Sequence, residues 1–253
     1  MKLIKIIDLI TEDFPLELQH ENDNSGLQVG SVHKIIKRVL ITLDITKDVI
    51  DEAIINEVDL ILSHHPLNFN PLRNVNYDEY YGYLISKVIE NNISVFSMHT
   101  NYDKAEKGMN YQLVKNLGAN DIMQSGYNDF LFTGKIKESD LTEFVDLIKN
   151  TYKRENIRYC GNSDVAISRI GIIGGSGGDY SDVDSAIKEG VDIFLTCDTK
   201  SSRMRYAVEN GLNVLDLSHN IEEIFVDHME KIISKTGIEV LKSNIQTDPY
   251  IFL

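Results

Sequence analysis

The segment DLILSHHPL at residues 59–67 sets the organisation of the chain, because an apolar run leads directly into two histidines and a proline. Such a run is typical of a buried strand, and Pro66 fixes φ and ends the strand's hydrogen bonding. The residues before it, 46–58, have the apolar spacing of a helix. A similar segment, DIFLTCDTK at residues 192–200, follows another stretch with helical spacing. We therefore expect two copies of one α/β unit.

The similarity between the two halves extends over three consecutive elements. Residues 182–198 align with residues 49–65 at an offset of 133 (192 − 59), and residues 209–220 align with residues 90–101 at an offset of 119 (209 − 90). The first copy therefore carries about 14 extra residues (133 − 119), directly after the paired histidines. Any two units of this kind resemble each other somewhat, but shared small and apolar positions over three elements favour an internal duplication.

The alternation of strand-like and helix-like runs predicts an α/β fold made of two similar units, residues 1–125 and 126–253. We expect these units to face each other across a metal-binding cleft, since ligands in such sheets gather at the carboxyl ends of strands. In the first copy we expect strands at 38–45, 59–63 and 93–99, and helices at 46–58, 80–90 and 104–118.

Composition narrows the class of protein. The net charge of −14 repels phosphate backbones, so general nucleic-acid binding is not expected. Cys160 and Cys197 form no CxxC pair, which argues against a disulfide scaffold or a thiolate zinc site and suits a reducing cytoplasm. Residues 1–14 carry acidic side chains within an apolar run, so they predict an amphipathic helix rather than a signal peptide. No apolar run approaches the ~20 residues of a membrane span, and we expect a cytoplasmic protein without membrane contact.

Side chains that bind metals fall at the expected strand ends of both copies. They are His64, His65, His99 and Asp103 in the first copy, and His219, Glu222 and Glu223 in the second. Neighbouring residues within a strand point to opposite faces, so two adjacent histidines can reach one cavity only where the chain turns. Imidazole and carboxylate groups together are ligands for zinc, iron or manganese. A carboxylate such as that of Asp103 can bridge two ions with its two oxygens.

Each of these residues also has a structural interpretation. A single histidine near a strand is usually a hydrogen-bonded residue of the core. Glu223 fits the third position of a capping box that begins at Asn220, and Asp103 fits a helix cap with Glu106 at the third position. The occurrence of all these residues at equivalent strand ends favours a metal site. The glycine-rich segment 174–178 lacks the Lys-Ser/Thr of a P-loop, and we expect a tight turn there.

The motifs NDNSGLQVG, SHHP, HTNYD, GGSGGD and SHNIEE occur in this order over nearly the whole chain. Together they resemble the NIF-three-like (Ngg-interacting factor three) family, whose members are also described as GTP cyclohydrolase 1 type 2 homologs. The pairing of HHP with HTNxD is specific, whereas the glycine-rich segment is not. The resemblance implies a duplicated α/β fold, a toroidal homohexamer and two divalent metal ions per subunit. It places the metal ligands on His64, His65, Asp103, His219 and Glu223.

Three positions depart from the family pattern. Ser218 stands where the family usually has glycine, Glu222 stands where it has serine, and Cys197 replaces the glycine of a TGD motif. The metal ligands are retained, so these departures concern the substrate side of the expected pocket.

Two functions follow from a dinuclear metal site. The first is a hydrolase of a small polar, nucleotide-like substrate, because two ions lower the pKa of water and hold the attacking and leaving oxygens. GTP ring opening is a narrower version that rests on the resemblance, and His99 and Glu222 are the nearest candidates for proton transfer. The alternative is a non-enzymatic protein that binds or delivers metal, or a regulator that works through partners. The residues name neither the metal nor the substrate.

Overall fold

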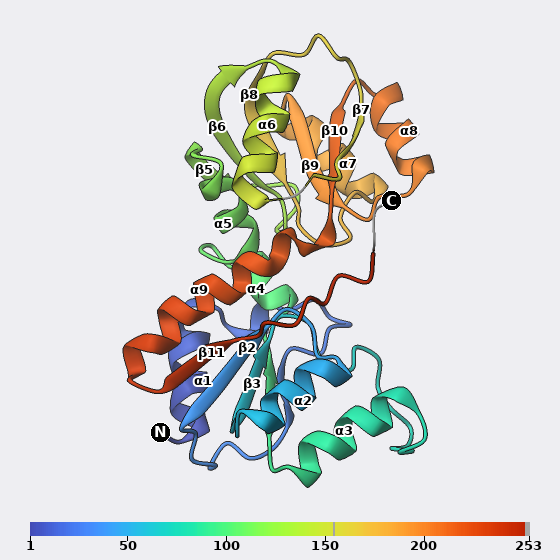
Figure 1. Ribbon diagram of the computed structural model, residues 1–253. Helices are drawn as coiled ribbons and strands as arrows, with labels where there is room; N and C mark the ends of the chain where they lie inside the picture. The colour runs from blue at the N-terminus through green and yellow to red at the C-terminus, as the bar shows by residue number, and fades with distance from the viewer. Residues whose placement is uncertain (154, 251–253) are drawn as a thin grey trace. The chain divides into compact units, whose positions relative to one another are not determined.

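The computed structural model describes residues 1–153 and 155–250, which form two compact units (Figure 1). Unit 1 comprises residues 1–105 and 223–250, and unit 2 lies within residues 106–222. These bounds differ from the division at residue 125 that the sequence suggested. The chain returns to the first sheet at its end, where β11 (Glu239–Lys242) pairs in parallel with β2 (Arg38–Thr42).

Unit 1 is built on a five-stranded sheet in the order β1-β4-β3-β2-β11. Its other strands are β1 (Gly26–Val29), β3 (Leu60–Ser63) and β4 (Ser94–Ser97). Its helices are α1 (Leu3–Asp13), η1 (Leu16–Leu18), α2 (Lys47–Ile55), α3 (Tyr80–Glu90), α4 (Thr100–Lys104), α9 (Ile224–Ile233) and η3 (Ser234–Thr236). Helices α2 and α3 pack on the sheet face that includes Leu40, Ile61 and Val95, and Figure 1 shows α1 and α9 on the other side.

Unit 2 is built on a six-stranded sheet in the order β5-β6-β8-β9-β10-β7. The strands are β5 (Asn120–Gln124), β6 (Phe132–Ser139), β7 (Arg158–Cys160), β8 (Ile167–Ile172), β9 (Ile193–Cys197) and β10 (Asn213–Leu217). The helices are α5 (Met109–Asn116), α6 (Leu141–Tyr152), α7 (Tyr180–Glu189) and α8 (Ser201–Glu209). A 3-10 turn, η2 (His219–Glu223), follows β10 and ends where unit 1 resumes.

The three central strands of the two sheets share one connectivity, which agrees with the predicted fold class. Strands β2, β3 and β4 are parallel and joined through α2 and α3, while β8, β9 and β10 are parallel and joined through α7 and α8. Leu60 pairs with Ser94 in the first sheet, and Ile193 pairs with Asn213 in the second. The offset of 133 relates Leu60 to Ile193, and the offset of 119 relates Ser94 to Asn213. This correspondence is what an internal duplication predicts.

A pair of aspartates repeats the same local bond in both sheets. Asp59 Oδ2 accepts hydrogen bonds from the backbone N–H groups of Lys37 and Arg38, at 2.7 and 3.1 Å. Asp192 Oδ2, 133 residues later, accepts them from Ser168 and Arg169, the second and third residues of β8, at 2.8 and 2.7 Å. Each carboxylate fixes the start of one strand against the start of the next, so it supports the register of its sheet.

Two local predictions are wrong. The helix expected at 104–118 is limited to α5, Met109–Asn116, and a separate short helix, α4, covers Thr100–Lys104, so Asp103 lies inside α4 and does not cap a helix. Glu223 does not complete a capping box either, because α9 begins at Ile224 and Glu223 occupies its N-cap position without a side-chain capping bond. Both carboxylates are therefore placed for a role other than capping.

Within residues 1–153 and 155–250, no helix combines the length and the apolar character that crossing a membrane requires.

Candidate metal site

His64 and His65 leave β3 where the chain turns. The His64 N–H donates to the carbonyl of Thr42 at 3.2 Å, and the His65 N–H donates to that of Leu43 at 3.0 Å. The His64 ring is fully buried and the His65 ring is 20% exposed. Their ring centroids are 4.8 Å apart, so the two imidazoles lie side by side, as their position at the strand end predicts.

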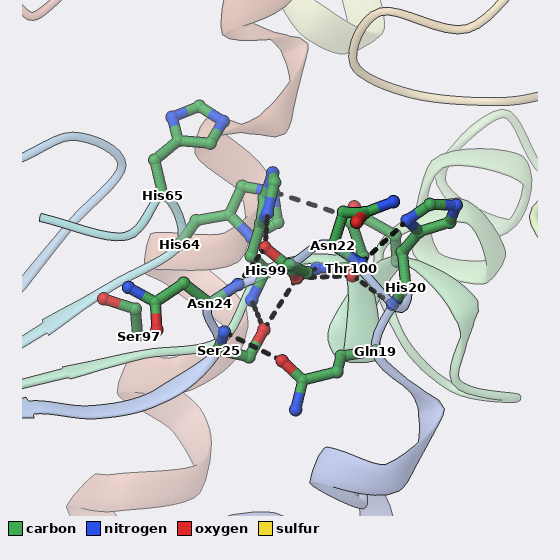
Figure 2. A network of polar contacts seen from close by, with 12 residues as sticks. Gln19, His20, Asn22, Asn24, Ser25, His64, His65, Ser97, His99 and Thr100 are labelled. Carbon is green, nitrogen blue, oxygen red and sulfur yellow. Dashed lines mark hydrogen bonds and ion pairs between the residues drawn. The ribbon is translucent and has the colours of Figure 1, made fainter. Parts of the chain in front are cut away.

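His99, at the end of β4, brings a third imidazole to the same place. Its ring centroid lies 5.4 Å from that of His64 and 5.5 Å from that of His65. One ring nitrogen from each of the three histidines lies within 4.8 Å of the others, so the three can hold a metal ion together. Figure 2 shows this group, with Ser25 and Thr100 beside His99.

Each of the three histidines is held by an oxygen at its Nδ1 atom. The pairs are His64 with the Met98 carbonyl at 2.7 Å, His65 with Asp44 Oδ1 at 2.6 Å, and His99 with Asp23 Oδ1 at 2.7 Å. An oxygen acceptor at Nδ1 favours the tautomer whose proton sits there, which leaves Nε2 with its lone pair. All three rings are therefore oriented to offer Nε2 as a ligand, the arrangement in which metal-binding histidines are usually found.

Asp23 belongs to the NDNSGLQVG motif, to which the sequence assigned no role. Its side chain is fully buried and accepts hydrogen bonds from His99, Ser25, Asn24 and both the N–H and hydroxyl of Thr100. Burial by itself raises the pKa of Asp23, but the hydrogen bond and charge of His99 and the bonds from Thr100 and Asn24 outweigh it. They hold the pKa well below its ordinary value, so the group behind His99 is a carboxylate.

Asp103 joins the histidines from α4. Its Oδ1 lies 3.5 Å from His64 Nε2, and its side chain is 15% exposed. The preceding residue, Tyr102, is fully buried and anchors the helix, packing edge-on against Phe14 and placing its hydroxyl 2.6 Å from Nδ1 of His228. Burial, together with the charge of Asp103, raises the pKa of Tyr102 well above its ordinary value, so the hydroxyl stays protonated.

Unit 2 has a second cluster of histidine and carboxylate side chains, at the carboxyl ends of β9 and β10. His219 Nδ1 lies 2.6 Å from Asp198 Oδ2, and His219 Nε2 lies 2.8 Å from Glu222 Oε2. The Glu222 side chain is 2% exposed. Burial, followed by the charges of Glu222, Asp216 and Asp198, raises the pKa of the Cys197 thiol well above its ordinary value, which excludes a thiolate at the TCD position.

The glycine-rich segment 174–178 turns against Glu222. Gly175 has φ +62°, and a Cβ atom there would lie 3.0 Å from Glu222 Oε1. Glycine is required at this position both for the left-handed backbone and for the close approach of the carboxylate. The segment therefore lies against Glu222, with Gly174 and Gly175 both close to its Oε1 atom.

The structure brings together some of the metal ligands that the sequence predicted. Unit 1 brings together His64, His65 and Asp103, with His99 beside them, and unit 2 holds His219 against Glu222. Participation of His219 and Glu223 in one site with the unit 1 ligands stays a prediction. The sequence placed Asp198 at a strand end of the second copy but assigned it no ligand role, and it did not indicate Asp23 or Asp44, although Asp44 lies two residues after β2.

Comparisons with known proteins give a consistent result. A family model described as Duf34/NIF3 (NGG1p interacting factor 3) matches residues 1–249. A Clostridium perfringens protein is 35% identical over 264 residues, covering 100% of both chains, and one from Clostridium acetobutylicum is 34% identical, covering 98% of this chain and 99% of the relative. Both relatives are named GTP cyclohydrolase 1 type 2 homolog.

Solved structures show the same fold. A Staphylococcus aureus hypothetical protein is 27% identical with a TM-score of 0.91, and the alignment covers 100% of this chain and 99% of that one. Reduced HcgD from Methanocaldococcus jannaschii is 28% identical with a TM-score of 0.82, and the alignment covers 97% and 98% of the two chains.

Proposed function

Because this chain belongs to the Duf34/NIF3 family, we propose that it is a metal-dependent hydrolase of a small polar, nucleotide-like substrate, with two divalent ions per subunit. The proposed ligands are His64, His65, Asp103, His219 and Glu223. The observation that carries the proposal is the cluster of imidazoles in unit 1, each held at Nδ1 by an oxygen and each offering Nε2.

The donor set fits zinc, iron or manganese. Neutral imidazole nitrogens suit these metals, whereas calcium and magnesium prefer sites made of oxygen ligands alone. The carboxylates of Asp23 and Asp44 lie behind two of the rings, and their negative charge offsets part of the positive charge of a bound ion. Asp103 would add carboxylate oxygens to this donor set.

Two bound ions would supply Lewis acidity and make water a nucleophile at neutral pH. The residues of the chain bind the ions and handle the proton. His99 Nε2 and Glu222 Oε2 are the proposed sites of proton transfer, since neither residue belongs to the proposed ligand set. Glu222 is buried and lies against His219, where a water-poor environment strengthens electrostatic interactions.

GTP ring opening is a narrower form of the proposal. Its support is the name GTP cyclohydrolase 1 type 2 homolog shared by the two clostridial relatives. The departures at Ser218, Glu222 and Cys197 lie in unit 2, beside the proposed ligand His219, and Cys197 Sγ is 3.6 Å from the Ser218 carbonyl. Substrate choice is where we expect this chain to differ from its relatives.

The proposal is tested by turnover of the metal-loaded protein against a panel of nucleotides and phosphoesters. We expect turnover of at least one compound, and its loss in Asp103→Ala. Asp8→Ala, an exposed carboxylate on α1, is the matched control and should retain full activity. If no compound is turned over while the protein passes its metal reversibly to an acceptor, the enzyme proposal fails in favour of metal delivery.

A further inference from the structure

We propose that Thr247 positions His65 through Asp44, so that the tail after β11, residues 243–250, is coupled to the histidine cluster of unit 1. The inference rests on the proposed function, since His65 is one of its ligands, and it assigns a role to a segment that lies outside the motifs and the proposed ligand set. Thr247 is a positioning residue, because it acts on His65 through another side chain.

The tail continues the first sheet beyond β11. Its first residue, Ser243, donates its N–H to the Ile41 carbonyl of β2 at 2.9 Å. Residues 241, 243, 245 and 247 are partly buried, whereas residues 242, 244 and 246 are exposed. This alternation is that of an extended chain with one face against the protein, and Ile245 packs on the core cluster of α2 and α3. In Figure 1 the tail is the red segment that runs on from β11.

A carboxylate on α2 fastens the tail. Glu52 Oε2 accepts the Ser243 hydroxyl at 2.5 Å, and Glu52 Oε1 accepts the backbone N–H and the side-chain amide of Asn244 at 3.0 and 3.3 Å. The Ser243 hydroxyl in turn accepts the Ile245 N–H at 3.2 Å. These bonds hold the chain on a fixed path just before it reaches Thr247.

At the end of this path the tail meets the support of His65. Thr247 Oγ1 donates to Asp44 Oδ2 at 2.7 Å, across 203 positions of the sequence, and Asp44 Oδ1 lies 2.6 Å from His65 Nδ1. The two oxygens of one carboxylate are thus divided between the tail and the imidazole. The bond to Oδ2 fixes the plane of the carboxylate and keeps Oδ1 on the ring, which holds the tautomer and the direction of Nε2.

Asp44 depends on such a bond more than the carboxylate behind His99 does. The Asp23 side chain is fully buried and also accepts bonds from Ser25 and Thr100, whereas the Asp44 side chain is 36% exposed. A partly exposed carboxylate can turn toward water and release the ring. The tail therefore gives Asp44 the anchoring that the interior of the unit gives Asp23.

Coupling of this kind acts in both directions. Because the Thr247 bond favours the orientation of His65 that binds an ion, a bound ion favours the docked tail by the same factor. Displacement of the tail accordingly weakens the metal site without altering any of its ligands.

The first experiment compares the metal-free full chain with Thr247→Val by ¹⁵N NMR of labelled histidine at about pH 8, where an ordinary imidazole is neutral. In the parent, Nδ1 of His65 should carry the proton, and in Thr247→Val the His65 signals should move toward a mixture of tautomers. Thr247→Ser retains the hydroxyl and should restore the parent signals. Thr236→Val is the matched control, since its hydroxyl donates to the Ile233 carbonyl at 2.7 Å, outside the tail, and it should match the parent.

The second experiment measures the Zn²⁺ affinity of the same proteins by competition with a chromophoric chelator. Thr247→Val should weaken it about 3- to 10-fold, less than the about 10- to 100-fold expected when the direct partner of a ligand histidine is lost. Zn²⁺ should also slow hydrogen exchange at the Ile245 N–H of the parent, and it should do so less in Thr247→Val.

Identical His65 signals in the parent and Thr247→Val would overturn the inference. If that variant does not fold, the unaltered chain decides, because Zn²⁺ binding that leaves exchange in the tail unchanged also overturns it. A chain that binds no Zn²⁺ contradicts the proposed metal site, and the metal-free His65 signals then decide the inference alone. Absence of turnover alongside the expected NMR and Zn²⁺ results contradicts only the proposed hydrolase function.

Discussion

Replacement of Asp23 by asparagine tests how far one buried carboxylate supports the histidine cluster of unit 1, His64, His65 and His99. Asp23 Oδ1 accepts N–H groups from His99 and Asn24, both at 2.7 Å, and Oδ2 accepts the Thr100 N–H at 3.0 Å and the Ser25 hydroxyl at 2.9 Å. The asparagine side chain has the same shape but only one acceptor oxygen. Whichever way it turns, its amide group faces an N–H that loses its acceptor.

The expected cost is about 3 kcal/mol of the free energy of unfolding. A hydrogen bond to a charged group contributes about 1.5–3 kcal/mol, and a buried donor left without an acceptor costs about 1–3 kcal/mol. Urea unfolding of the full metal-free chain, followed by circular dichroism at pH 7, measures this difference. Asp8→Asn is the control, because Asp8 is exposed and its contact with Lys5 is 3.5 Å long, and it should change stability little.

The difference in unfolding free energy between the parent and Asp23→Asn should also depend on pH. The pKa of Asp23 in the folded chain lies below its ordinary value of 3.8, so the unfolded chain takes up a proton first as the pH falls. The stabilisation is therefore fully present above about pH 4 and is lost as the pH falls below that value. The reasoning would be refuted if the free energies of unfolding of the parent and Asp23→Asn differed by less than about 1 kcal/mol at pH 7. It would also be refuted if this difference grew as the pH fell.

Three further predictions concern groups around the two clusters. Tyr102→Phe removes the hydroxyl that lies 2.6 Å from His228 and should lower the unfolding free energy by about 1 kcal/mol, measured by urea denaturation; an unchanged midpoint would contradict the bond's contribution. Cys197, buried and with a raised pKa, should react with a thiol reagent at pH 8 only after denaturant is added, and rapid reaction of the folded chain would show that the site is open. Gly175→Ala should destabilise the chain more than Gly118→Ala, because both have a left-handed backbone but only Gly175 has Glu222 within 3.0 Å of the added Cβ; equal losses would mean that the carboxylate moves freely.

Assembly is a separate expectation. We propose a homohexamer, as the family resemblance implies, and light scattering should then give a mass about six times the 28.7 kDa of the chain. A monomeric mass at the concentrations used for assays would contradict it.

The repeated part of the fold could be predicted from the sequence because local patterns determine it. Buried parallel strands are short apolar runs, and a fixed offset between two such sets predicts their pairing. The offsets of 133 (192 − 59) and 119 (209 − 90) relate the Leu60–Ser94 pair to the Ile193–Asn213 pair. The division into units was not predictable in this way. It depends on β11 joining β2, a pairing of segments about 200 residues apart (239 − 38) that no local pattern encodes.

The candidate site could be predicted only where its residues follow parallel strands. His64, His65 and His99 follow β3 and β4, and the sequence placed them at one edge of the sheet. Asp44 follows β2 at that same edge, so the same rule would have found it. Asp23 precedes the antiparallel edge strand β1 and reaches His99 through a loop, so nothing in its spacing indicated the contact.

The central claim, a metal site at the end of β3, is tested most directly by the metal content of the purified chain. Elemental analysis after loading with zinc, iron or manganese and removal of unbound ions should give two divalent ions per chain in the parent protein, and fewer in His65→Ala. His33→Ala, a histidine outside both clusters, should match the parent. A parent protein that retains no metal, with His65→Ala unchanged from it, would contradict the account.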